Sequence, residues 1–168
     1  MELCSLNGLI VALDEARIDP RDRGFQFGDA LYEVVKVAGG TALHLEAHLD
    51  RLRGGLHRVD IPIPDRLAER CRDLLRASSL DAGSLYLQVT RGVAARSRMP
   101  PAGLEPTVVI LPSRHGFDPP AGRPLAAVTL ADPRWRYCDV KTTSLMGAVV
   151  GKLAAREAGA DEVIFVGL

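Results

Sequence analysis

The sequence has no surplus of charge and no long apolar run, and each shortage argues against a class of protein. Lys and Arg together number 21, and so do Asp and Glu, so the formal net charge is zero. A protein that binds nucleic acid through phosphates needs a positive surplus, so no nucleic-acid partner is expected. No run of 18 apolar residues occurs, and the first residues lack the basic start of a signal peptide. We therefore expect a cytoplasmic protein without a membrane partner.

Cysteine is also scarce. Cys4, Cys71 and Cys138 are odd in number, far apart and without CxxC spacing, which argues against a disulfide framework and a structural zinc site. His44 and His48 are spaced like the histidines of a zinc helix. The metalloprotease motif, however, needs Glu directly after the first His. No metal is expected.

What the chain does contain is typical of a globular α/β protein. Of 168 residues, 47% are hydrophobic and 25% are charged. Asn-Gly at 7–8 between two apolar runs predicts a hairpin, and alternation over 85–89 predicts a half-buried strand. Further strands are expected over 30–37, 41–43, 107–111, 125–130, 138–142 and 162–166, and helices over 45–59, from about 64, and over 145–158.

The region 112–124 holds four prolines and two glycines, which predicts a boundary between structural units. The predicted organisation is an N-terminal α/β domain over 1–111, a Pro/Gly-rich linker over 112–124 and a second unit over 125–168.

Lys141 is the first candidate for chemistry. It stands between Val140 and Thr142, in a short strand that leads into an apolar helix. Burial lowers the pKa of a lysine, and the neutral amine can then form a Schiff base with a carbonyl. The alternative is an edge lysine whose ammonium reaches solvent.

Arg51 and Tyr32 are two further candidates. Arg51 borders the apolar stripe of the predicted helix over 45–59, where a guanidinium can grip a phosphate. The alternative is an ordinary surface ion pair, for example with Asp50 or Glu46. Tyr32, in the predicted strand over 30–37, can present a phenol to a cleft or serve only as an amphipathic core residue.

Three arginines, Arg91, Arg96 and Arg98, crowd one loop with no acid between them. Such a loop can capture a carboxylate, or it can be a solvated basic surface.

Several separate blocks of the sequence carry a family resemblance. The blocks are Asp22-Arg23-Gly24-Phe25-Gln26-Phe27-Gly28-Asp29 with Leu31-Tyr32-Glu33-Val34-Val35-Lys36-Val37, His48-Leu49-Asp50-Arg51-Leu52, Tyr86-Leu87-Gln88-Val89-Thr90-Arg91-Gly92, Asp132-Pro133-Arg134-Trp135 with Cys138-Asp139-Val140-Lys141, Gly147-Ala148-Val149-Val150 and Ala158-Gly159-Ala160-Asp161-Glu162. They occur in order and in register over residues 1–166, and they resemble the class IV aminotransferases, most closely the D-amino-acid transaminases within that family. The resemblance predicts the α/β fold of the two-domain class IV type.

The resemblance implies a pyridoxal 5′-phosphate enzyme that transfers an amino group between a D-amino acid and an α-keto acid. Lys141 matches the lysine that forms the Schiff base with the cofactor and moves the proton. Arg51 matches the arginine that holds the cofactor phosphate, and Tyr32 matches a tyrosine near the substrate carboxylate. Arg96 matches a carboxylate-binding arginine that reaches across a dimer interface, so a homodimer is implied.

The sequence departs from the family pattern in two ways, and each leaves alternative functions open. The family group reads Arg-x-His where this chain reads Arg96-Ser97-Arg98, so the substrate can differ. Members also continue well past the equivalent of Leu168. We therefore expect a complete N-terminal domain, only the beginning of the second domain, and little transaminase activity from the chain as written. The alternatives are a branched-chain-type aminotransferase, an aminodeoxychorismate lyase of the same fold, and an inactive truncated remnant.

Overall fold

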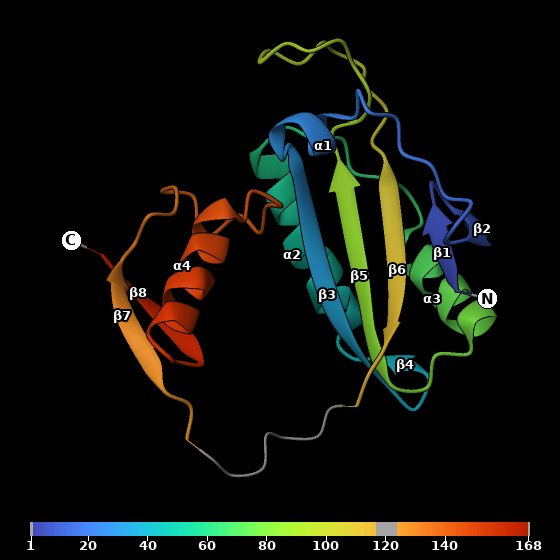
Figure 1. Ribbon diagram of the computed structural model, residues 1–168. Helices are drawn as coiled ribbons and strands as arrows, with labels where there is room; N and C mark the ends of the chain where they lie inside the picture. Colours follow the sequence, from blue (N-terminus) through green and yellow to red (C-terminus); the bar gives the residue numbers. More distant parts are fainter. Residues whose placement is uncertain (1, 117–123, 168) are drawn as a thin grey trace. The chain divides into compact units, whose positions relative to one another are not determined.

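A computed structural model describes residues 2–116 and 124–167 as two compact units (Figure 1). The first unit comprises the described residues up to 116 together with Val140–Thr143, and the second comprises the remainder. The strands are β1 (Leu3–Leu6), β2 (Leu9–Ala12), β3 (Ala30–Ala38), β4 (Thr41–Ala42), β5 (Gly83–Thr90), β6 (Val108–Arg114), β7 (Ala127–Ala131) and β8 (Glu162–Val166). The helices are α1 (Arg23–Phe27), α2 (Leu45–Arg58), α3 (Leu67–Ser78) and α4 (Met146–Glu157).

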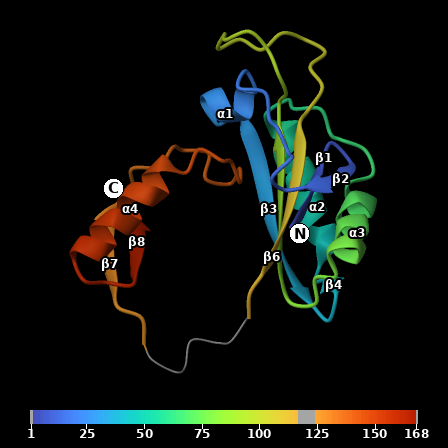
Figure 2. The ribbon, with the colours of Figure 1, turned by 45° about the vertical axis from the view of Figure 1, so that its right-hand side comes forward.

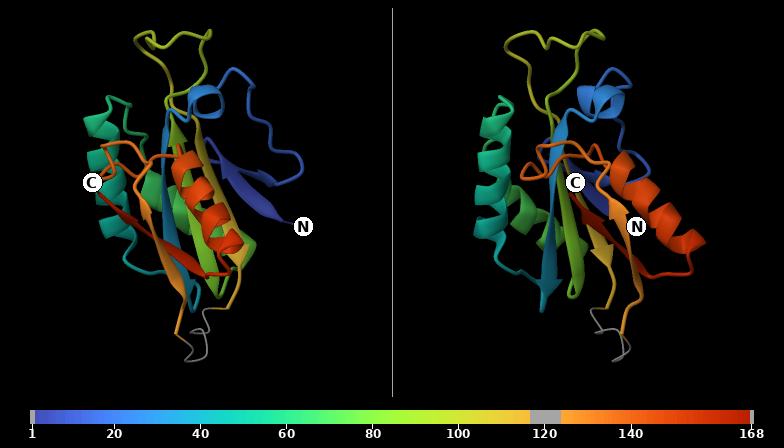
Figure 3. Two further views of the ribbon diagram at one scale, coloured as in Figure 1. Left: turned by 60° about the vertical axis from the view of Figure 1, so that its left-hand side comes forward. Right: turned by 90° about the vertical axis from the view of Figure 1, so that its left-hand side faces the viewer.

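The first unit is built on a six-stranded sheet with the strand order β2-β1-β6-β5-β3-β4. Every pairing in it is antiparallel. Helices α2 and α3 lie against the same face of this sheet (Figures 1 and 3). The opposite face carries the outward side chains of β3 and β5, among them Tyr32 and Tyr86, whose rings stack with centroids 5.4 Å apart.

The core lies between the sheet and its two helices. Strand β5 buries alternate residues, as predicted, and α2 buries one leucine stripe because its apolar residues recur every three or four positions. The buried side chains shared by these elements include Leu31, Val35, Val37, Leu45, Leu49, Leu52, Leu56, Leu74, Leu85, Leu87, Val89 and Ile110. The predicted α/β architecture is confirmed in this unit.

The hairpin predicted at Asn-Gly is also confirmed (Figure 2). Asn7 and Gly8 have φ values of 53° and 90°, and Leu6 pairs with Leu9 across the turn. Both turn residues adopt positive φ, which Asn and Gly tolerate better than other residues.

The second unit is a small β-α-β arrangement. Strands β7 and β8 pair in parallel, and α4 is the crossover between them. The helix passes close to β8 at Gly151, where a β-carbon would stand 2.3 Å from Cζ of Phe165. Helix α4 matches the helix expected over 145–158, and β8 matches the strand expected over 162–166.

Two segments differ from their expected places. Residues 140–143 belong to the first unit, where Thr142 bridges Leu31 of β3, so the strand expected over 138–142 is not a third strand of the second unit. Strand β6 continues through Pro112 to Arg114. Strand β1 pairs with β6 only at residues 109 and 110, so it does not reach Pro112. Proline is tolerated at such an unpaired position of a strand, because it has no N–H to donate. Residues 117–123 of the expected linker lie outside the described residues.

No helix within residues 2–116 and 124–167 is both long and apolar enough to cross a membrane.

Candidate functional site

Lys141 lies beside Tyr32, because the segment 140–143 runs antiparallel to the start of β3. The Tyr32 backbone N–H donates to the Lys141 carbonyl oxygen over 3.0 Å, and the Thr143 N–H donates to the Ala30 carbonyl oxygen over 3.0 Å. This register places the Tyr32 and Lys141 side chains on the same face. The Lys141 Nζ stands 4.2 Å from the centroid of the Tyr32 ring, within the range of a cation–π contact.

The residues flanking Lys141 anchor it to the first unit. Val140 and Thr142 are 3% and 8% exposed, and Val140 belongs to the core of that unit. The Thr143 hydroxyl donates to the Gly28 carbonyl oxygen over 3.2 Å. Gly28 ends α1 with a φ of 65°, so the end of α1 holds this segment. Lys141 itself is partly buried, and its amine is directed over an aromatic ring.

Arg51 pairs with neither of the acids expected from the sequence. Asp50 pairs with Arg53, and Glu46 pairs with Arg72. The guanidinium of Arg51 instead holds Glu33 of β3: Nε donates to Oε1 and Nη2 donates to Oε2, both over 2.6 Å. Asp50 and Glu46, the example partners of the ion-pair alternative, are thus wrong. The partner is Glu33, which lies 18 residues away in the sequence.

Glu33 is a fully buried carboxyl whose partners keep it ionised. Its side chain is 0% exposed, and His48 Nδ1 lies 2.8 Å from Oε2. Burial alone raises the pKa of Glu33, but the hydrogen bonds and charges of Arg51 and His48 outweigh it and lower the pKa below its ordinary value. Arg51 and His48 are three positions apart, on the same side of α2.

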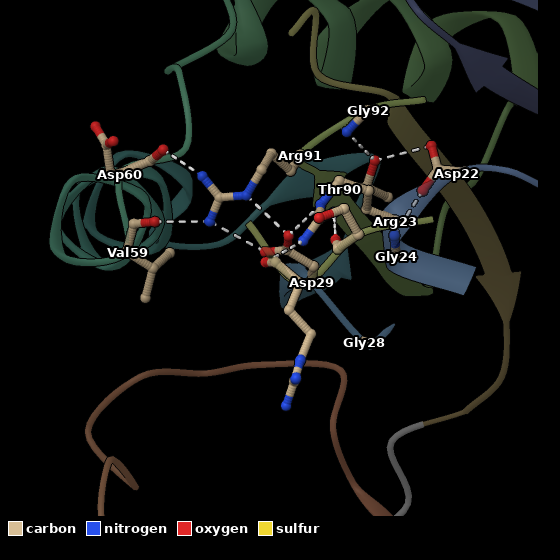
Figure 4. A network of polar contacts seen from close by, with 12 residues as sticks. Asp22, Arg23, Gly24, Gly28, Asp29, Val59, Asp60, Thr90, Arg91 and Gly92 are labelled. Atoms are coloured by element: carbon tan, nitrogen blue, oxygen red, sulfur yellow. Dashed lines mark hydrogen bonds and ion pairs between the residues drawn. The ribbon is translucent and has the colours of Figure 1, made fainter. Parts of the chain in front are cut away.

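A second network joins α1 to the end of β5 (Figure 4). Asp29 accepts hydrogen bonds from Arg23 Nε over 2.8 Å and from Arg91 Nε and Nη2 over 2.8 and 3.1 Å. Arg91 Nη2 also donates to the carbonyl oxygen of Val59 at the end of α2. Burial alone raises the pKa of Asp29, but the hydrogen bonds and charges of Arg91 and Arg23 outweigh it and lower the pKa.

The same network continues through Asp22, the N-cap of α1. Asp22 Oδ1 accepts from the Gly24 N–H over 2.7 Å, and Oδ2 accepts from the Thr90 hydroxyl over 2.9 Å. Thr90 Oγ1 in turn accepts from the Gly92 N–H over 2.9 Å. A β-carbon on Gly24 would stand 2.5 Å from Cγ2 of Thr90, so the first turn of α1 needs glycine there.

The loop with Arg96 and Arg98 is held by the buried Arg23. Arg23 Nη1 and Nη2 donate to the carbonyl oxygens of Ser97 and Arg98, and the Arg96 guanidinium stands 5.1 Å from the Phe27 ring centroid. The side chains of Arg96 and Arg98 are exposed. In the part of the chain that the structure describes, no contact joins either arginine to Lys141 or Tyr32. The structure therefore brings Tyr32 and Lys141 together, and within one chain it does not add the loop arginines to them.

Glu33, Arg23 and Asp29 are the residues that the sequence analysis did not single out for a role. For Glu33 a signal existed, because it occupies an inward position of the alternating strand over 30–37, among Leu31, Val35 and Val37. An acid in such a row needs a partner.

Two other features are separate from these residues. A surface groove of about 660 Å³ lies over the start of α2 and along α3, lined by Thr41, Leu45 and Arg72 among others, and it includes neither Lys141 nor Arg51. Among residues 2–116 and 124–167, no three His, Cys, Asp or Glu side chains are grouped as metal ligands.

Comparison with known proteins relates this geometry to one family. The family described as Amino-transferase class IV matches residues 30–167. The D-alanine aminotransferase of Bacillus licheniformis is 34% identical over 170 residues, which cover 95% of this chain and 58% of that protein. The chain therefore spans a little under three fifths of the length of that relative.

Solved structures share the fold. The 4-amino-4-deoxychorismate lyase from Pseudomonas aeruginosa matches with a TM-score of 0.74 at 27% identity, over 99% of this chain and 62% of that one. A branched-chain amino acid aminotransferase from Escherichia coli matches with a TM-score of 0.86 at 17% identity, over 99% of this chain and 58% of that one. Another branched-chain amino acid aminotransferase, complexed with N-(5′-phosphopyridoxyl)-L-glutamate, matches with a TM-score of 0.85 at 18% identity, over the same shares of the two chains. These matches confirm the expected fold, and because the family match spans residues 30–167, most of the chain, the chain belongs to the class IV aminotransferases.

Proposed function

We propose that this chain carries the cofactor lysine of a pyridoxal 5′-phosphate transaminase that transfers an amino group between a D-amino acid and an α-keto acid. The observation that carries the proposal is the amine of the partly buried Lys141, 4.2 Å from the Tyr32 ring centroid. The 34% identity to a D-alanine aminotransferase supports the D-amino acid as substrate.

The side chains of this unit fit a cofactor with an aldehyde at one end and a phosphate at the other. Among the described residues no carboxylate pairs with the Lys141 amine, whereas Lys152 Nζ lies 2.7 Å from Glu162. Arg51 keeps Nη1 unbonded within the described part of the chain, which leaves one donor for a phosphate. Lys141 contacts Tyr32 and Arg51 contacts Glu33, which are consecutive residues of β3 with side chains on opposite faces of the sheet, so the amine and the guanidinium reach the same part of this strand from its two sides.

When bound, pyridoxal phosphate supplies the electron sink that stabilises negative charge at the α-carbon of the amino acid. Lys141 would hold the cofactor through its amine and would move the proton at the α-carbon of the substrate. The Tyr32 ring shields one side of the Lys141 amine from water. The Tyr32 hydroxyl can donate a hydrogen bond to the substrate carboxylate, and Arg51 holds the phosphate.

Specificity is assigned to the loop with Arg96 and Arg98. Two guanidinium groups on an exposed loop suit the carboxylate of a substrate, and a second arginine in place of histidine keeps a permanent charge there. Because no contact joins the loop to Lys141 among the described residues of one chain, we propose a homodimer in which the loop serves the site of the partner. The branched-chain aminotransferase and lyase alternatives predict other substrates. Comparing D-alanine, L-valine and aminodeoxychorismate under the same conditions distinguishes these activities.

An absorbance titration tests the role of Lys141. The chain has only three lysines, Lys36, Lys141 and Lys152, so each can be replaced in turn. Added pyridoxal phosphate is expected to give the band of a protonated Schiff base, which Lys141→Ala abolishes and the matched control Lys152→Ala retains. Borohydride reduction and peptide mapping should find the cofactor on residue 141. A band that survives in Lys141→Ala contradicts the assignment, and no band in the unaltered chain favours a non-catalytic remnant.

A further inference from the structure

Glu33 is an acid placed where the strand pattern demands an apolar residue. Its neighbours on the inward face of β3 are Leu31, Val35 and Val37, and all four residues are at most 3% exposed. Moving an ionised carboxylate out of water is strongly unfavourable unless partners replace the lost hydration. A buried ion pair contributes little net stability compared with apolar packing. Stability alone therefore does not account for an acid at this position.

The partners of Glu33 hold it from two sides. Arg51 donates to both carboxylate oxygens in a fork geometry with two distances of 2.6 Å, and His48 Nδ1 lies 2.8 Å from the oxygen that also receives Arg51 Nη2. Such a two-bond contact fixes the plane of a guanidinium as well as its position. The plane of the Arg51 guanidinium is thus set by a carboxylate that is itself packed in the core.

The side chains of Glu33 and Arg51 differ in their exposure to solvent. The Glu33 side chain is 0% exposed, whereas the Arg51 side chain is 58% exposed. Two guanidinium nitrogens face the carboxylate, and within the described residues Nη1 makes no hydrogen bond. Arg51 is therefore a surface arginine whose Nε and Nη2 are held by a buried carboxylate, while Nη1 is available as a donor. Arg53 and Arg72 differ from it, because their partner acids are themselves exposed. Fixing a donor before binding reduces the conformational entropy lost on binding.

We propose that Glu33 is a positioning residue for phosphate recognition, which orients the Arg51 guanidinium so that Nη1 faces the phosphate of the cofactor, while His48 fixes the carboxylate. The inference rests on the proposed function, because it assumes that Arg51 meets the phosphate.

The test compares two ligands that differ only in the phosphate. The dissociation constants of pyridoxal 5′-phosphate and pyridoxal are measured on the full chain from the Lys141 absorbance band, and their ratio reports the contribution of the phosphate. In Glu33→Gln, the loss of a charge-assisted contact is expected to lower the preference for the phosphorylated ligand about tenfold, with pyridoxal binding unchanged. A purely structural role would weaken both ligands alike.

Two variants make the result specific. Glu46→Gln is the matched control, because Glu46 also pairs with an arginine but is exposed, and it should leave the ratio unchanged. His48→Ala, at a partly exposed side chain, should lower the preference by a smaller factor and keeps the test available if Glu33→Gln unfolds.

A double-mutant cycle identifies the residue through which Glu33 acts. In an Arg51→Ala background Glu33→Gln should have no further effect on the ratio, and the double variant leaves no buried charge. An unchanged ratio in Glu33→Gln, or an equal loss in the Arg51→Ala background, overturns the inference alone. A chain in which Lys141 binds neither ligand overturns the proposed function and this inference with it.

Discussion

Asp29 is the residue on which two guanidinium groups of the first unit converge. Arg23 is 3% exposed, and its Nε shares Asp29 Oδ2 with Nε of Arg91. The carboxylate thus carries one negative charge against two positive ones. The remaining donors of both arginines end on backbone carbonyl oxygens, at Ser97 and Arg98 for Arg23 and at Val59 and Asp60 for Arg91. Asp29 therefore links the loop 91–105 to the end of α2.

Asp29→Asn is expected to destabilise the chain at neutral pH by about 2 kcal/mol, the scale of hydrogen bonds to charged groups. The pKa of Asp29 is lower in the folded chain than its ordinary value of 3.8. The folded state then binds fewer protons than the unfolded state, so the stabilisation is complete above about pH 5 and is lost as the pH falls through the folded pKa. The difference in unfolding free energy between the unaltered chain and Asp29→Asn should therefore shrink toward zero on acidification.

Urea unfolding at a series of pH values measures this difference. Glu33 also has a lowered pKa, but it remains in both chains, so its contribution cancels. Asp50→Asn is the control, since Asp50 pairs with Arg53 but is 73% exposed and should cost less than about 1 kcal/mol at any pH. A difference for Asp29→Asn that stays constant down to pH 3 would contradict the role of the ionised carboxylate.

At the scale of elements, α2 contains two adjacent glycines in different surroundings. A β-carbon on Gly54 would meet nothing within 4 Å, whereas one on Gly55 would stand 2.5 Å from Cδ2 of Leu31. Leu31 is 3% exposed and also bridges Thr142, so it has little room to move. The close approach of α2 to β3 therefore depends on Gly55 and not on Gly54.

Alanine at the two positions should act with opposite signs. Gly54→Ala is expected to raise the free energy of unfolding by about 0.5–1 kcal/mol, through helix propensity and a less flexible unfolded chain. Gly55→Ala should lower it by about 1 kcal/mol or more, because overpacking exceeds the same gain. Thermal or urea unfolding of both variants measures the pair, with each serving as the control for the other. Equal stabilisation by both substitutions would show that Leu31 moves freely.

Local patterns predict the elements of this chain well where one period holds over several residues. The leucines of α2, the alternation of β5 and the Asn-Gly turn each place their residues correctly, because the pattern and the buried face coincide. The segment 140–143 escapes such reasoning, because its partner in β3 is about 110 residues earlier in the chain. The candidate site shows the same division between what local patterns predict and what they miss. The family blocks predict Lys141 and Tyr32 as site residues. No local pattern pairs Arg51 with Glu33, because the two residues are 18 positions apart.

At the scale of the whole molecule, the segment 140–143 with the candidate lysine belongs to one unit, while the segments before and after it belong to the other. Residues 124–139 and 144–167 form the second unit, and the chain returns to the first for four residues only. Those four residues carry Lys141 to β3 and its Tyr32 ring. The loop with Arg96 also belongs to the first unit, and within the described part of the chain its contacts are with Phe27 and Arg23 and not with Lys141.

This separation leads to a prediction about two copies of the chain. If the loop serves the site of a partner, a mixture of Arg96→Ala and Lys141→Ala chains should contain dimers with one intact site and one doubly altered site. Random pairing of equal amounts gives such dimers half of the time, so about a quarter of all sites should be intact. The measurement is the loss of the Lys141 absorbance band on adding D-alanine, against each variant alone and against a mixture with Arg53→Ala in place of Arg96→Ala. A mixture no more responsive than its separate components would show that Arg96 serves its own chain.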